Sequence, residues 1–440
     1  MASQAIPGPR GQWFVGDVVA YQRDRLAWLT ASREKYGDVV RLAPDIVVVH
    51  DAELAHEVLA STNDTYTVDS MLRAGRRERE LNEAHLRVWM PVRRDVWRAI
   101  ADRITQLHVE RAISDVDAGL RHHSGRRIDI VSACRAMLGA AIVDFCLGGH
   151  AQPALLATVC EAADDLFLSA LRALVNGEGR TAWSRRPAAR AAVAANRRLL
   201  DLLERLVRQR CAQGVPAEPR DLLDGLVTDR SSDADIDRAV HVLRTIMFAS
   251  HGVPGAALSW IALLLAEHPD VAASVAAEAD GVSLGHAAID PASLPYTKAT
   301  IKEAIRLYPP QWLLTRTTTQ PVELGGFRVA PGTEVLICPY LMHRRPRWWE
   351  EPERFRPDRW LSGERPHARH AYIPFGAGPR VCPGSLLATV QLTVAIVSLA
   401  RGYRLDLPPL AGVRSGTDGL MLPLDLAGSW HAIASKAPVG

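Results

Sequence analysis

The sequence predicts a mainly α-helical protein with a small β-sheet subdomain. Apolar residues recur at helical spacing through most of the chain between Asp51 and Gln311. Short runs rich in β-branched residues, which are typical of strands, occur near residue 40 and again after residue 320. Hydrophobic residues make up 48% of the 440 residues, which is enough to build a large core without disulfides.

The expected elements follow one another along the chain. Two strands are expected on either side of a turn at Asp45, over Val39–Leu42 and Ile46–Val49. Helices are expected next, over Ala52–Ala60, Ala84–Ile113, Ile128–Leu147, Pro153–Val175, Ala188–Arg210, Ala234–Glu267 and Tyr296–Leu307. Gly-Gly and Pro-Gly turns then accompany two further strands, Val322–Leu324 and Glu334–Cys338.

The chain is expected to form one compact domain over residues 1–440. No low-complexity linker and no internal repeat interrupts the sequence. The two nearest candidates for breaks, Gly177–Arg190 and Gly214–Arg220, are short enough to be loops.

Charge and cysteine content exclude several classes of protein. A net charge of +3 is too small to indicate nucleic-acid binding. The six cysteines have no paired spacing, so we expect reduced thiols in a cytoplasm rather than disulfides. The N-terminal residues show no signal-peptide pattern, and the most apolar long stretch, Ala256–Ala266, is too short to cross a bilayer. We therefore expect a soluble, cytoplasmic protein.

The most informative motif surrounds Cys382, in the run Phe375-Gly-Ala-Gly-Pro-Arg-Val-Cys-Pro-Gly384. Its glycines let the backbone turn sharply and approach a flat cofactor closely, and Arg380 supplies a fixed cation. Apolar residues at helical spacing follow Pro383, so Cys382 is expected at a helix N-terminus, where amide groups stabilise a thiolate. The simpler alternative is a buried structural cysteine in a glycine-rich loop.

This run resembles the haem-binding loop of the cytochrome P-450 family, because every fixed position of Phe-Gly-x-Gly-x-Arg-x-Cys-x-Gly is filled. The resemblance covers essentially the whole chain and implies the cytochrome P-450 fold with haem b (iron protoporphyrin IX) as cofactor. It makes Cys382 the thiolate ligand of the iron, a ligand that favours O–O cleavage. It also places Phe375, Gly376 and Gly384 against the haem.

The resemblance implies a set of groups for the two haem propionates. Trp89-Met-Pro-Val-Arg93 matches the family's Trp-x-x-x-Arg element, which puts an indole N–H and a guanidinium one helical turn apart. Arg316 and Arg380 occupy the places of two further propionate arginines, and the planar fork of arginine suits a carboxylate. Core packing is the alternative for Trp89, and a solvated basic face is the alternative for Arg93.

A second pair of segments matches the family's ionic cluster beneath the haem. Glu303 and Arg306 lie three residues apart on one helical face, just before Pro309-Pro310. About fifty residues later comes Pro352-Glu-Arg-Phe-Arg-Pro-Asp-Arg-Trp360. The resemblance implies a buried triad of Glu303, Arg306 and Arg354, which is expected to fix geometry rather than to add stability, because burying charges is costly.

The helix expected over the distal haem face departs from the family. The usual Ala/Gly-Gly-x-acid-Thr centre is replaced by the residues 249–253, Ala-Ser-His-Gly-Val, so both the acid and the alcohol that organise proton delivery are missing. Pro254 cannot donate to the carbonyl of Ser250, which predicts a kink with room for water or a substrate group. Ser250 and His251 are the remaining polar catalytic candidates. Alternatively, His251 faces away from the haem and Ser250 bonds to its own helix.

Residues of three segments are expected to contact the substrate. On the distal helix these are Met247, Ala249 and Ser250, and after the Glu-x-x-Arg helix they are Trp312 and Leu313. The charged segment Met71–Arg87 matches the family's variable substrate-capping loop. A solvated loop explains its charges better than selection of an anionic or carrier-bound substrate.

The resemblance implies a monomeric bacterial haem-thiolate monooxygenase that oxidises a small natural-product intermediate in secondary-metabolite or antibiotic biosynthesis. The chain has no flavin- or iron–sulfur-binding segment, so a ferredoxin and a ferredoxin reductase are expected to supply electrons, with Arg94 and Arg98 near the docking surface. One alternative is non-oxygenating haem-thiolate chemistry, such as oxidative coupling, rearrangement or a peroxide-driven reaction. Another, from a different class, is a non-catalytic haem protein that binds a ligand.

Overall fold

A computed structural model describes residues 5–10, 16–68, 90–98, 100, 103–149, 151–177, 182–282, 290 and 292–433, without the side chains of residues 103–107, 174–177 and 182–186. Its helices are α1 (Val18–Arg23), α2 (Arg25–Tyr36), α3 (Ala52–Ala60), α5 (Arg103–His123), α6 (Ile130–Leu147), α7 (Pro153–Gly177), α8 (Ala182–Gln213), α9 (Leu222–Leu226), α10 (Asp233–Glu267), α11 (Pro269–Asp280), α12 (Pro295–Leu307), α13 (Pro339–Met342) and α14 (Ser385–Gly402). Short 3-10 helices include η2 (Pro357–Trp360) and η3 (Gly378–Arg380).

Short strands form small sheets. The strands are β1 (Val39–Ala43), β2 (Ile46–Val49), β3 (Tyr66–Thr67), β4 (Ile128–Asp129), β5 (Leu314–Thr318), β6 (Val322–Leu324), β7 (Phe327–Val329), β8 (Glu334–Ile337), β9 (Tyr403–Asp406), β10 (Ser415–Gly416), β11 (Leu422–Pro423) and β12 (Ala427–Ala432). The largest sheet has the order β1-β2-β8-β5-β3, in which β2 and β8 run parallel and the other neighbours are antiparallel. It therefore joins the beginning of the chain to residues 314–337.

Local sequence explains where the main helices begin. The Asp51 carboxylate accepts hydrogen bonds from the backbone N–H groups of Glu53 and Leu54, which satisfies donors at the start of α3. Ser232 and Asp235 form a reciprocal capping box at the start of α10. From there α10 continues through Pro254 as one uninterrupted helix, so the proline does not end it.

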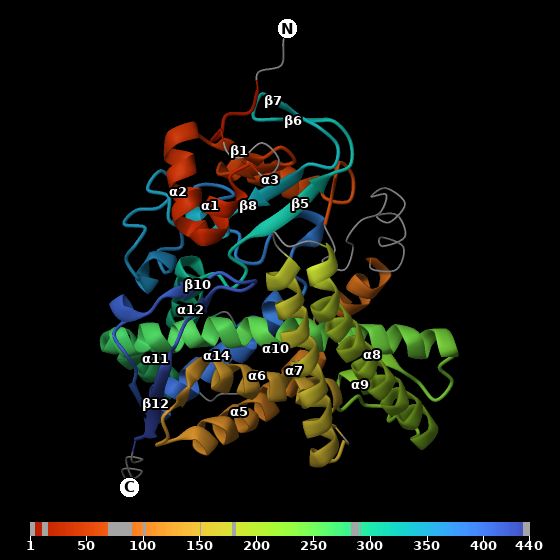
Figure 1. Cartoon of the computed structure of the whole chain (residues 1–440). Coiled ribbons are helices and arrows are strands. Elements are labelled where there is room, and N and C mark those ends of the chain that lie inside the picture. The colour runs from red at the N-terminus through yellow and green to blue at the C-terminus, as the bar shows by residue number, and fades with distance from the viewer. Residues whose placement is uncertain are drawn as a thin grey trace.

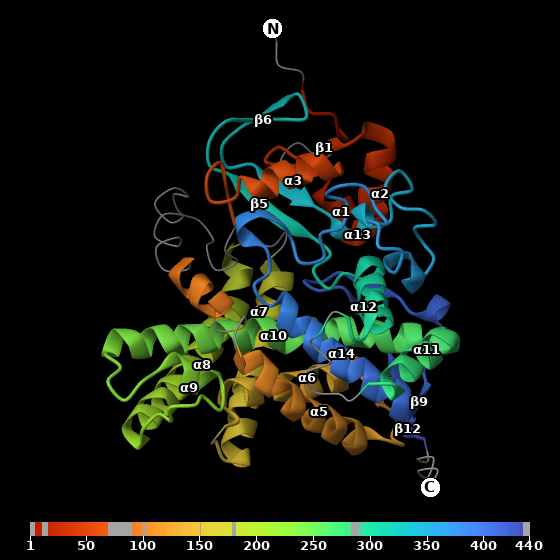
Figure 2. The ribbon, with the colours of Figure 1, turned by 180° about the vertical axis from the view of Figure 1, so that it is seen from behind.

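The long helix α10 lies at the centre of the molecule and separates its layers (Figures 1 and 2). It packs on α6, α7 and α8, and also on α14 and α12. Trp260 anchors it to two distant segments, because its ring stacks on Tyr308 with centroids 3.9 Å apart and its Nε1–H donates to the Met421 carbonyl at 3.1 Å. The β-sheet with α1, α2 and α3 lies above this helical layer in Figure 1.

Most expected elements are present, with a few differences. The helix α8 begins at Ala182, so much of the loop expected over Gly177–Arg190 is helical. The helix expected to end at Ile113 continues as α5 to His123. The strand β5 was not predicted from the sequence, because its residues, Leu-Thr-Arg-Thr-Thr, contain no apolar run.

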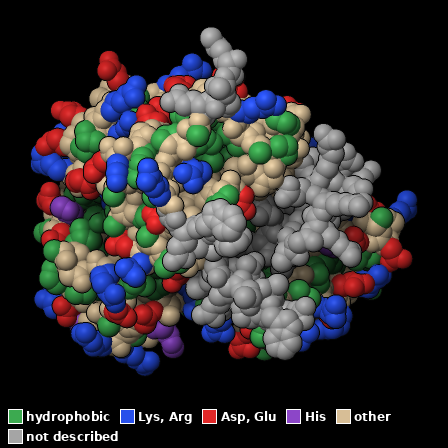
Figure 3. Space-filling view, turned by 45° about the horizontal axis from the view of Figure 1, so that its top comes forward, with side chains coloured by type: hydrophobic (Ala, Val, Ile, Leu, Met, Phe, Trp, Pro, Cys, Tyr) green, Lys and Arg blue, Asp and Glu red, His purple; other side chains and the backbone are tan. Residues whose placement is uncertain are grey.

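Three helices, α6, α10 and α14, are long and apolar enough to cross a membrane by length and composition alone. This corrects the expectation that only the shorter run Ala256–Ala266 needed to be considered. Between 56% and 78% of the residues in their most apolar windows are buried inside the protein. Interior packing therefore accounts for much of their apolar character. On the face shown in Figure 3, acidic and basic side chains are interspersed, in keeping with the net charge of +3.

Candidate functional site

The loop that carries Cys382 is shaped by backbone contacts and glycines. The Cys382 N–H donates to the Phe375 carbonyl at 2.8 Å and the Gly376 N–H donates to the Ile373 carbonyl at 3.0 Å, so the loop folds back on itself. Gly376 and Gly378 have φ values of +73° and +69°, a region that favours glycine. A Cβ built on Gly378 would overlap the Leu59 carbonyl, so glycine also lets this loop touch the end of α3.

Cys382 lies two residues before Gly384, the N-cap of α14, close to the expected helix start. Burial raises the pKa of its thiol, while a hydrogen bond from the Gly384 backbone and the charge of Arg93 act in the opposite direction. The protein alone therefore does not provide a stable thiolate here. A bound metal would, because coordination deprotonates a thiol outright.

Three arginines converge around this loop and are held by neutral oxygens. An Arg93 Nη2–H group donates to the Val381 carbonyl. The Arg380 Nε–H donates to Asn63 Oδ1, and the Arg316 Nε–H donates to Thr62 Oγ1, each at 2.8 Å. Thr62 and Asn63 directly follow the turn after α3 and thus position two of the three guanidinium groups.

The electrostatics of these arginines fit an anionic cofactor. Arg316 is only 6% exposed, and burial together with the charge of Arg380 lowers its pKa to about 10. Two guanidinium groups that disfavour each other's charge would be stabilised by carboxylates placed between them. A half-buried thiol, a glycine-lined loop and these cations form the donor set that a haem with two propionates requires. Arg93, Arg316, Arg380 and Cys382 can therefore hold haem.

Two of the predicted segments lie outside the described residues. These are Trp89, expected on a propionate, and Met71–Arg87, expected over the substrate. Phe375, Gly376 and Gly384 all belong to the described Cys382 loop and are half-buried.

The central turns of α10 present different residues to different neighbours. Ala249 is exposed and Val253 is half-buried, one turn apart on the same face, and Ser250 is half-buried beside them. Met247 is fully buried in an apolar cluster with Leu387 of α14. Outside α10, Trp312 is 2% exposed in the main core, and Leu313 packs half-buried against that core.

His251 lies on another side of α10, about 200° around the helix from Ala249. Its Nε2 is 2.9 Å from Asp164 Oδ1 of α7, and Arg135 of α6 forms an ion pair with the same oxygen. Its ring also lies against Gly139, where a built Cβ would come within 2.5 Å of Cε1. Burial and then the charge of Arg135 lower the pKa of His251 to about 4, so the imidazole is neutral at pH 7.

The missing acid at position 252 has a steric counterpart in the structure. A Cβ built on Gly252 would overlap the ring of Phe167, which reaches this point from α7. The position therefore has no room for any side chain unless the ring moves. The phenyl ring of Phe167, from α7, thus fills the space next to Gly252 where a carboxylate side chain would otherwise lie.

The ionic cluster around Glu303 is buried and complete. Arg306 binds Glu303 through Nε and Nη2 at 2.9 and 2.8 Å, and both side chains are fully buried. Arg359 Nε and Trp360 Nε1 donate to the same carboxylate at 2.9 and 2.8 Å. Burial alone would raise the pKa of Glu303, but the hydrogen bond from Arg306 and the charges of Arg306 and Arg359 hold it below its usual value.

The second arginine of this cluster, after Arg306, is Arg359, and the expectation of Arg354 was wrong. The Arg354 side chain is 67% exposed and pairs with Glu351 at 2.6 Å, and only its backbone carbonyl reaches Arg306, at 3.1 Å. The segment contains two similar tetrapeptides, Pro-Glu-Arg-Phe at 352–355 and Pro-Asp-Arg-Trp at 357–360. The second forms η2, which packs on α12 and so directs its arginine at Glu303.

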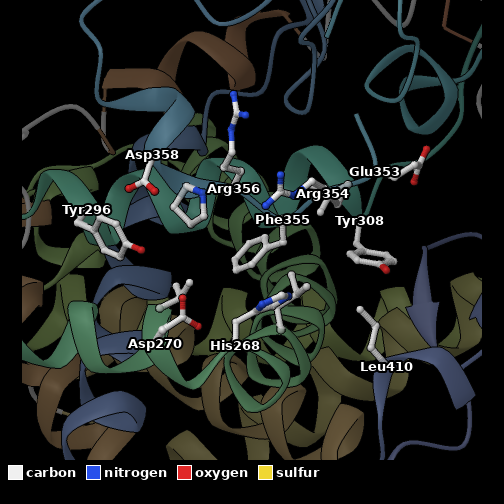
Figure 4. Close-up of a pocket in the computed structure, with 14 residues that line it drawn as sticks. His268, Asp270, Tyr296, Tyr308, Glu353, Arg354, Phe355, Arg356, Asp358 and Leu410 are labelled. Atoms are coloured by element: carbon white, nitrogen blue, oxygen red, sulfur yellow. The ribbon is translucent and has the colours of Figure 1, made fainter. Parts of the chain in front are cut away.

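A pocket of about 400 Å³ lies behind this cluster, between α10, α11, α12 and residues 353–358 (Figure 4). Phe355 projects into it over His268, with ring centroids 5.1 Å apart. Among the described residues that line it, none belongs to the predicted haem or substrate sites. We therefore assign it to the outer side of the ionic cluster and not to the Cys382 site.

Several residues that shape the site were not predicted, namely Thr62, Asn63, Asp164, Phe167 and Arg359. Arg359 could have been found from the second Pro-acid-Arg-aromatic tetrapeptide. Thr62 and Asn63 belong to an ordinary polar turn, Ser-Thr-Asn-Asp, which carries no motif. Asp164 and Phe167 look like any residues of an amphipathic helix, because their roles depend on where α7 crosses α10.

Comparisons with known proteins agree with this geometry. The cytochrome P450 family model matches residues 6–425. Cyclooctatin synthase of Streptomyces melanosporofaciens is 36% identical over 239 residues, which are 51% of this chain and 52% of that protein. Pentalenene oxygenase of Streptomyces avermitilis is 35% identical over 217 residues, 48% of this chain and 46% of that protein. The chain thus spans about half the length of the curated relatives it matches.

Solved structures show the same fold. The retinoic acid-bound cyanobacterial CYP120A1 matches with a TM-score of 0.76 at 19% identity, covering 98% of this chain and 100% of that chain. The heme domain of cytochrome P450DA matches with a TM-score of 0.78 at 18% identity, covering 98% of each chain. Together with the match over residues 6–425, this fold places the chain in the cytochrome P450 family, whose cofactor is haem b.

Proposed function

We propose that this protein is a haem-thiolate monooxygenase that uses O2 and externally supplied electrons to oxidise a small, hydrocarbon-rich natural-product intermediate. The observation that carries the proposal is the convergence of Cys382, Arg93, Arg316 and Arg380 around one glycine-shaped loop. Two relatives, a cyclooctat-9-en-7-ol 5-monooxygenase and the pentalenene oxygenase, are named for an unsaturated alcohol and an alkene. Such names support an apolar substrate made by a bacterial secondary pathway.

In this proposal the bound haem supplies the redox chemistry, with Cys382 as its thiolate ligand. Arg93, Arg316 and Arg380 bind the propionates and so fix the orientation of the ring. The face of α10 that carries Ala249 and Val253 covers the distal side, and Trp312 and Leu313 border it. The chain acts as one cytoplasmic haem-binding unit, without nucleic acid or membrane as partner.

Cys382 is tested by spectroscopy. The reduced, CO-bound protein is expected to show the red-shifted Soret band of a thiolate haem, and Cys382→Ala is expected to lose that band. Cys338→Ala serves as the matched control, because Cys338 is buried in the main core. A thiolate spectrum that survives in Cys382→Ala would exclude this cysteine as the ligand.

The protons for this reaction are proposed to come from Ser250, from water or from the substrate. Pro254 has no N–H to donate to the Ser250 carbonyl, so this carbonyl can hold a water molecule within α10. His251 is engaged with Asp164 and lies away from the Ala249 face, which supports a positioning role for it. Analogues that lack a polar group near the reacting carbon are then expected to consume reduced cofactor and release peroxide.

Electrons are proposed to arrive from a ferredoxin and its reductase at the surface near the Cys382 loop. Trp97 and Leu386 are 49% and 45% exposed, and Arg98 is a nearby exposed cation in the same helical segment as Trp97. A surface with apolar and basic groups suits an acidic redox protein. The rate of reduction is expected to fall as ionic strength rises, and Arg98→Glu is expected to slow it further. A rate that is unaffected by both would contradict this partner.

One observation favours a second function, namely haem-thiolate chemistry without oxygen insertion. Both Gly252 and Val253 lack the groups that usually organise proton delivery. Turnover under ¹⁸O2 separates the two functions. Incorporation of one ¹⁸O atom into the product supports the monooxygenase, whereas an oxidised, coupled or rearranged product without ¹⁸O supports the second function. Candidate substrates can be found first by their shift of the Soret band.

A further inference from the structure

Phe167 on α7 is the residue that meets the unusual centre of α10. It is 9% exposed and forms a separate apolar cluster with Ala256 and Leu420. Val253 of α10 and Leu171 of α7 pack at the edge of this cluster. Because Val253 lies on the same face of α10 as the exposed Ala249, the cluster adjoins the proposed distal pocket.

The contact between Phe167 and Gly252 depends on the absence of a side chain at position 252. A Cβ at this position would overlap the phenyl ring at Cζ and at both neighbouring ring carbons. Real Cβ atoms do not approach a ring in this way, so any larger residue at 252 would displace Phe167. The ring therefore occupies the volume into which an acidic side chain would extend.

A polar contact one helical turn away prevents α7 from simply moving aside. Asp164 precedes Phe167 by three residues, so both side chains leave α7 toward α10. Asp164 accepts a hydrogen bond at 2.9 Å from His251, the neighbour of Gly252, and pairs with Arg135. Two adjacent residues at the centre of α10, His251 and Gly252, thus both receive side chains from α7.

We propose that Phe167 is a specificity-determining residue whose ring, seated on Gly252, forms an apolar wall against the hydrocarbon part of the substrate. The inference rests on the proposed function only in assigning this space to a substrate. In this chain, an acid that would serve proton delivery has been exchanged for an apolar contact. Phe167 and Gly252 consequently act as a coupled pair, and neither can be altered without affecting the other.

The experiment uses two ligands that bind haem iron through the same ring nitrogen, imidazole and 4-phenylimidazole. Only the second carries an apolar group that can reach the wall. Dissociation constants from the Soret shift and melting temperatures are measured for Phe167→Leu, Phe167→Ala, Gly252→Ala and the double variant Phe167→Ala/Gly252→Ala. Gly402→Ala is the matched glycine control, because a Cβ there meets nothing within 4 Å. Phe355→Ala is the phenylalanine control, because its ring lies over His268 in the pocket outside the Cys382 site.

We expect Phe167→Ala to raise the dissociation constant of 4-phenylimidazole about tenfold and that of imidazole less than about twofold. A tenfold change corresponds to the loss of roughly 50 Å² of apolar contact. Gly252→Ala is expected to lower the melting temperature, and this cost is expected to vanish in the double variant. If Phe167→Ala fails to load haem, Phe167→Leu gives the same comparison with a smaller change in volume.

Two results would overturn the inference. One is an equal change in the affinities of both ligands in the Phe167 variants. The other is a fall in melting temperature caused by Gly252→Ala that is just as large when Phe167 is already alanine. Failure of the proposed function has a different signature, because a product without ¹⁸O leaves the ratio of the two ligand affinities unaffected.

Discussion

Arg306 and Arg359 share the buried carboxylate of Glu303, whereas Arg93, Arg316 and Arg380 surround the Cys382 loop and are held by neutral oxygens. In the first group, charge and hydrogen-bonding capacity are balanced within the protein. In the second group, burial and then the charge of Arg380 lower the pKa of Arg316 to about 10, so both disfavour its charged form. The charges of Arg306 and Arg359 are therefore balanced by Glu303, whereas the charge of Arg316 is disfavoured by its surroundings.

The difference in charge balance indicates a structural role for the Glu303 cluster and a cofactor-binding role for the arginines around the Cys382 loop. A balanced buried cluster is retained because removing one member leaves an uncompensated charge, even though the whole cluster adds little net stability. Two cations that disfavour each other, such as Arg316 and Arg380, are instead stabilised when an anion binds between them. The Glu303 cluster is thus expected to respond to mutation through folding, and the Arg316 group through haem retention.

The largest effect is expected for Glu303→Ala, which leaves Arg306 and Arg359 buried without a carboxylate. The loss is roughly 3–5 kcal/mol of unfolding free energy, a large share of ordinary stability. Soluble yield and haem content after expression measure it. Glu204→Ala is the control, because Glu204 is half exposed in a surface pair with Arg208 and is worth less than about 1 kcal/mol. A soluble, haem-replete Glu303→Ala protein with lowered turnover alone would contradict the structural role.

The next effect distinguishes two arginines in neighbouring tetrapeptides. Arg359→Met is expected to cost roughly 2–3 kcal/mol, less than a fully broken pair because Arg306 still balances Glu303. Arg354→Met is expected to cost less than about 0.5 kcal/mol, since this side chain is 67% exposed. Urea unfolding of the two holoproteins compares them directly. Equal losses of unfolding free energy in both variants would show that Arg354 also contributes to the Glu303 cluster.

Arg316→Gln tests the role of the arginines around the Cys382 loop in retaining haem. Glutamine can keep a hydrogen bond to Thr62 but removes the buried charge, so haem is expected to transfer to excess apomyoglobin about tenfold faster. Stability of the haem-free protein is expected to stay the same or to rise, because the repulsion from Arg380 disappears. Arg414→Gln, on a 76% exposed side chain, controls for the loss of a positive charge. A less stable haem-free Arg316→Gln protein would place Arg316 with the structural cluster.

The smallest effect concerns His251 and is confined to mild acid. Its pKa is lowered from 6.5 to about 4 in the folded protein, so the unfolded chain takes up a proton that the folded chain does not. Stability should therefore fall as pH drops from 6.5 toward 4. His251→Gln is expected to remove a part of this fall, on the order of 1 kcal/mol between about pH 7 and about pH 5. An unchanged pH slope in urea unfolding would show that His251 does not titrate in this way.

Sequence patterns predicted those elements of the protein whose structure depends on neighbouring residues in the chain. The beginnings of α3 and α10 follow from their capping residues. The Cys382 loop follows from its glycines, which have positive φ or touch α3. The pairing of Phe167 with Gly252 could not be read in this way, because it depends on where two helices cross. Arg354 was expected in the cluster because Pro-Glu-Arg-Phe resembles the family's segment. Only the packing of η2 on α12 shows that Arg359, in the similar tetrapeptide that follows, contacts Glu303 instead.

The hydrogen bonds around the Cys382 loop also bear on how the protein is made. Thr62 bonds a residue 254 positions away, Asn63 bonds one 317 positions away, and Arg93 bonds one 288 positions away. Contacts between such remote segments close large loops and form slowly, after local helices are in place. Haem capture should therefore be a late event in folding, so a chain interrupted during maturation would hold its helices well before it could retain its cofactor.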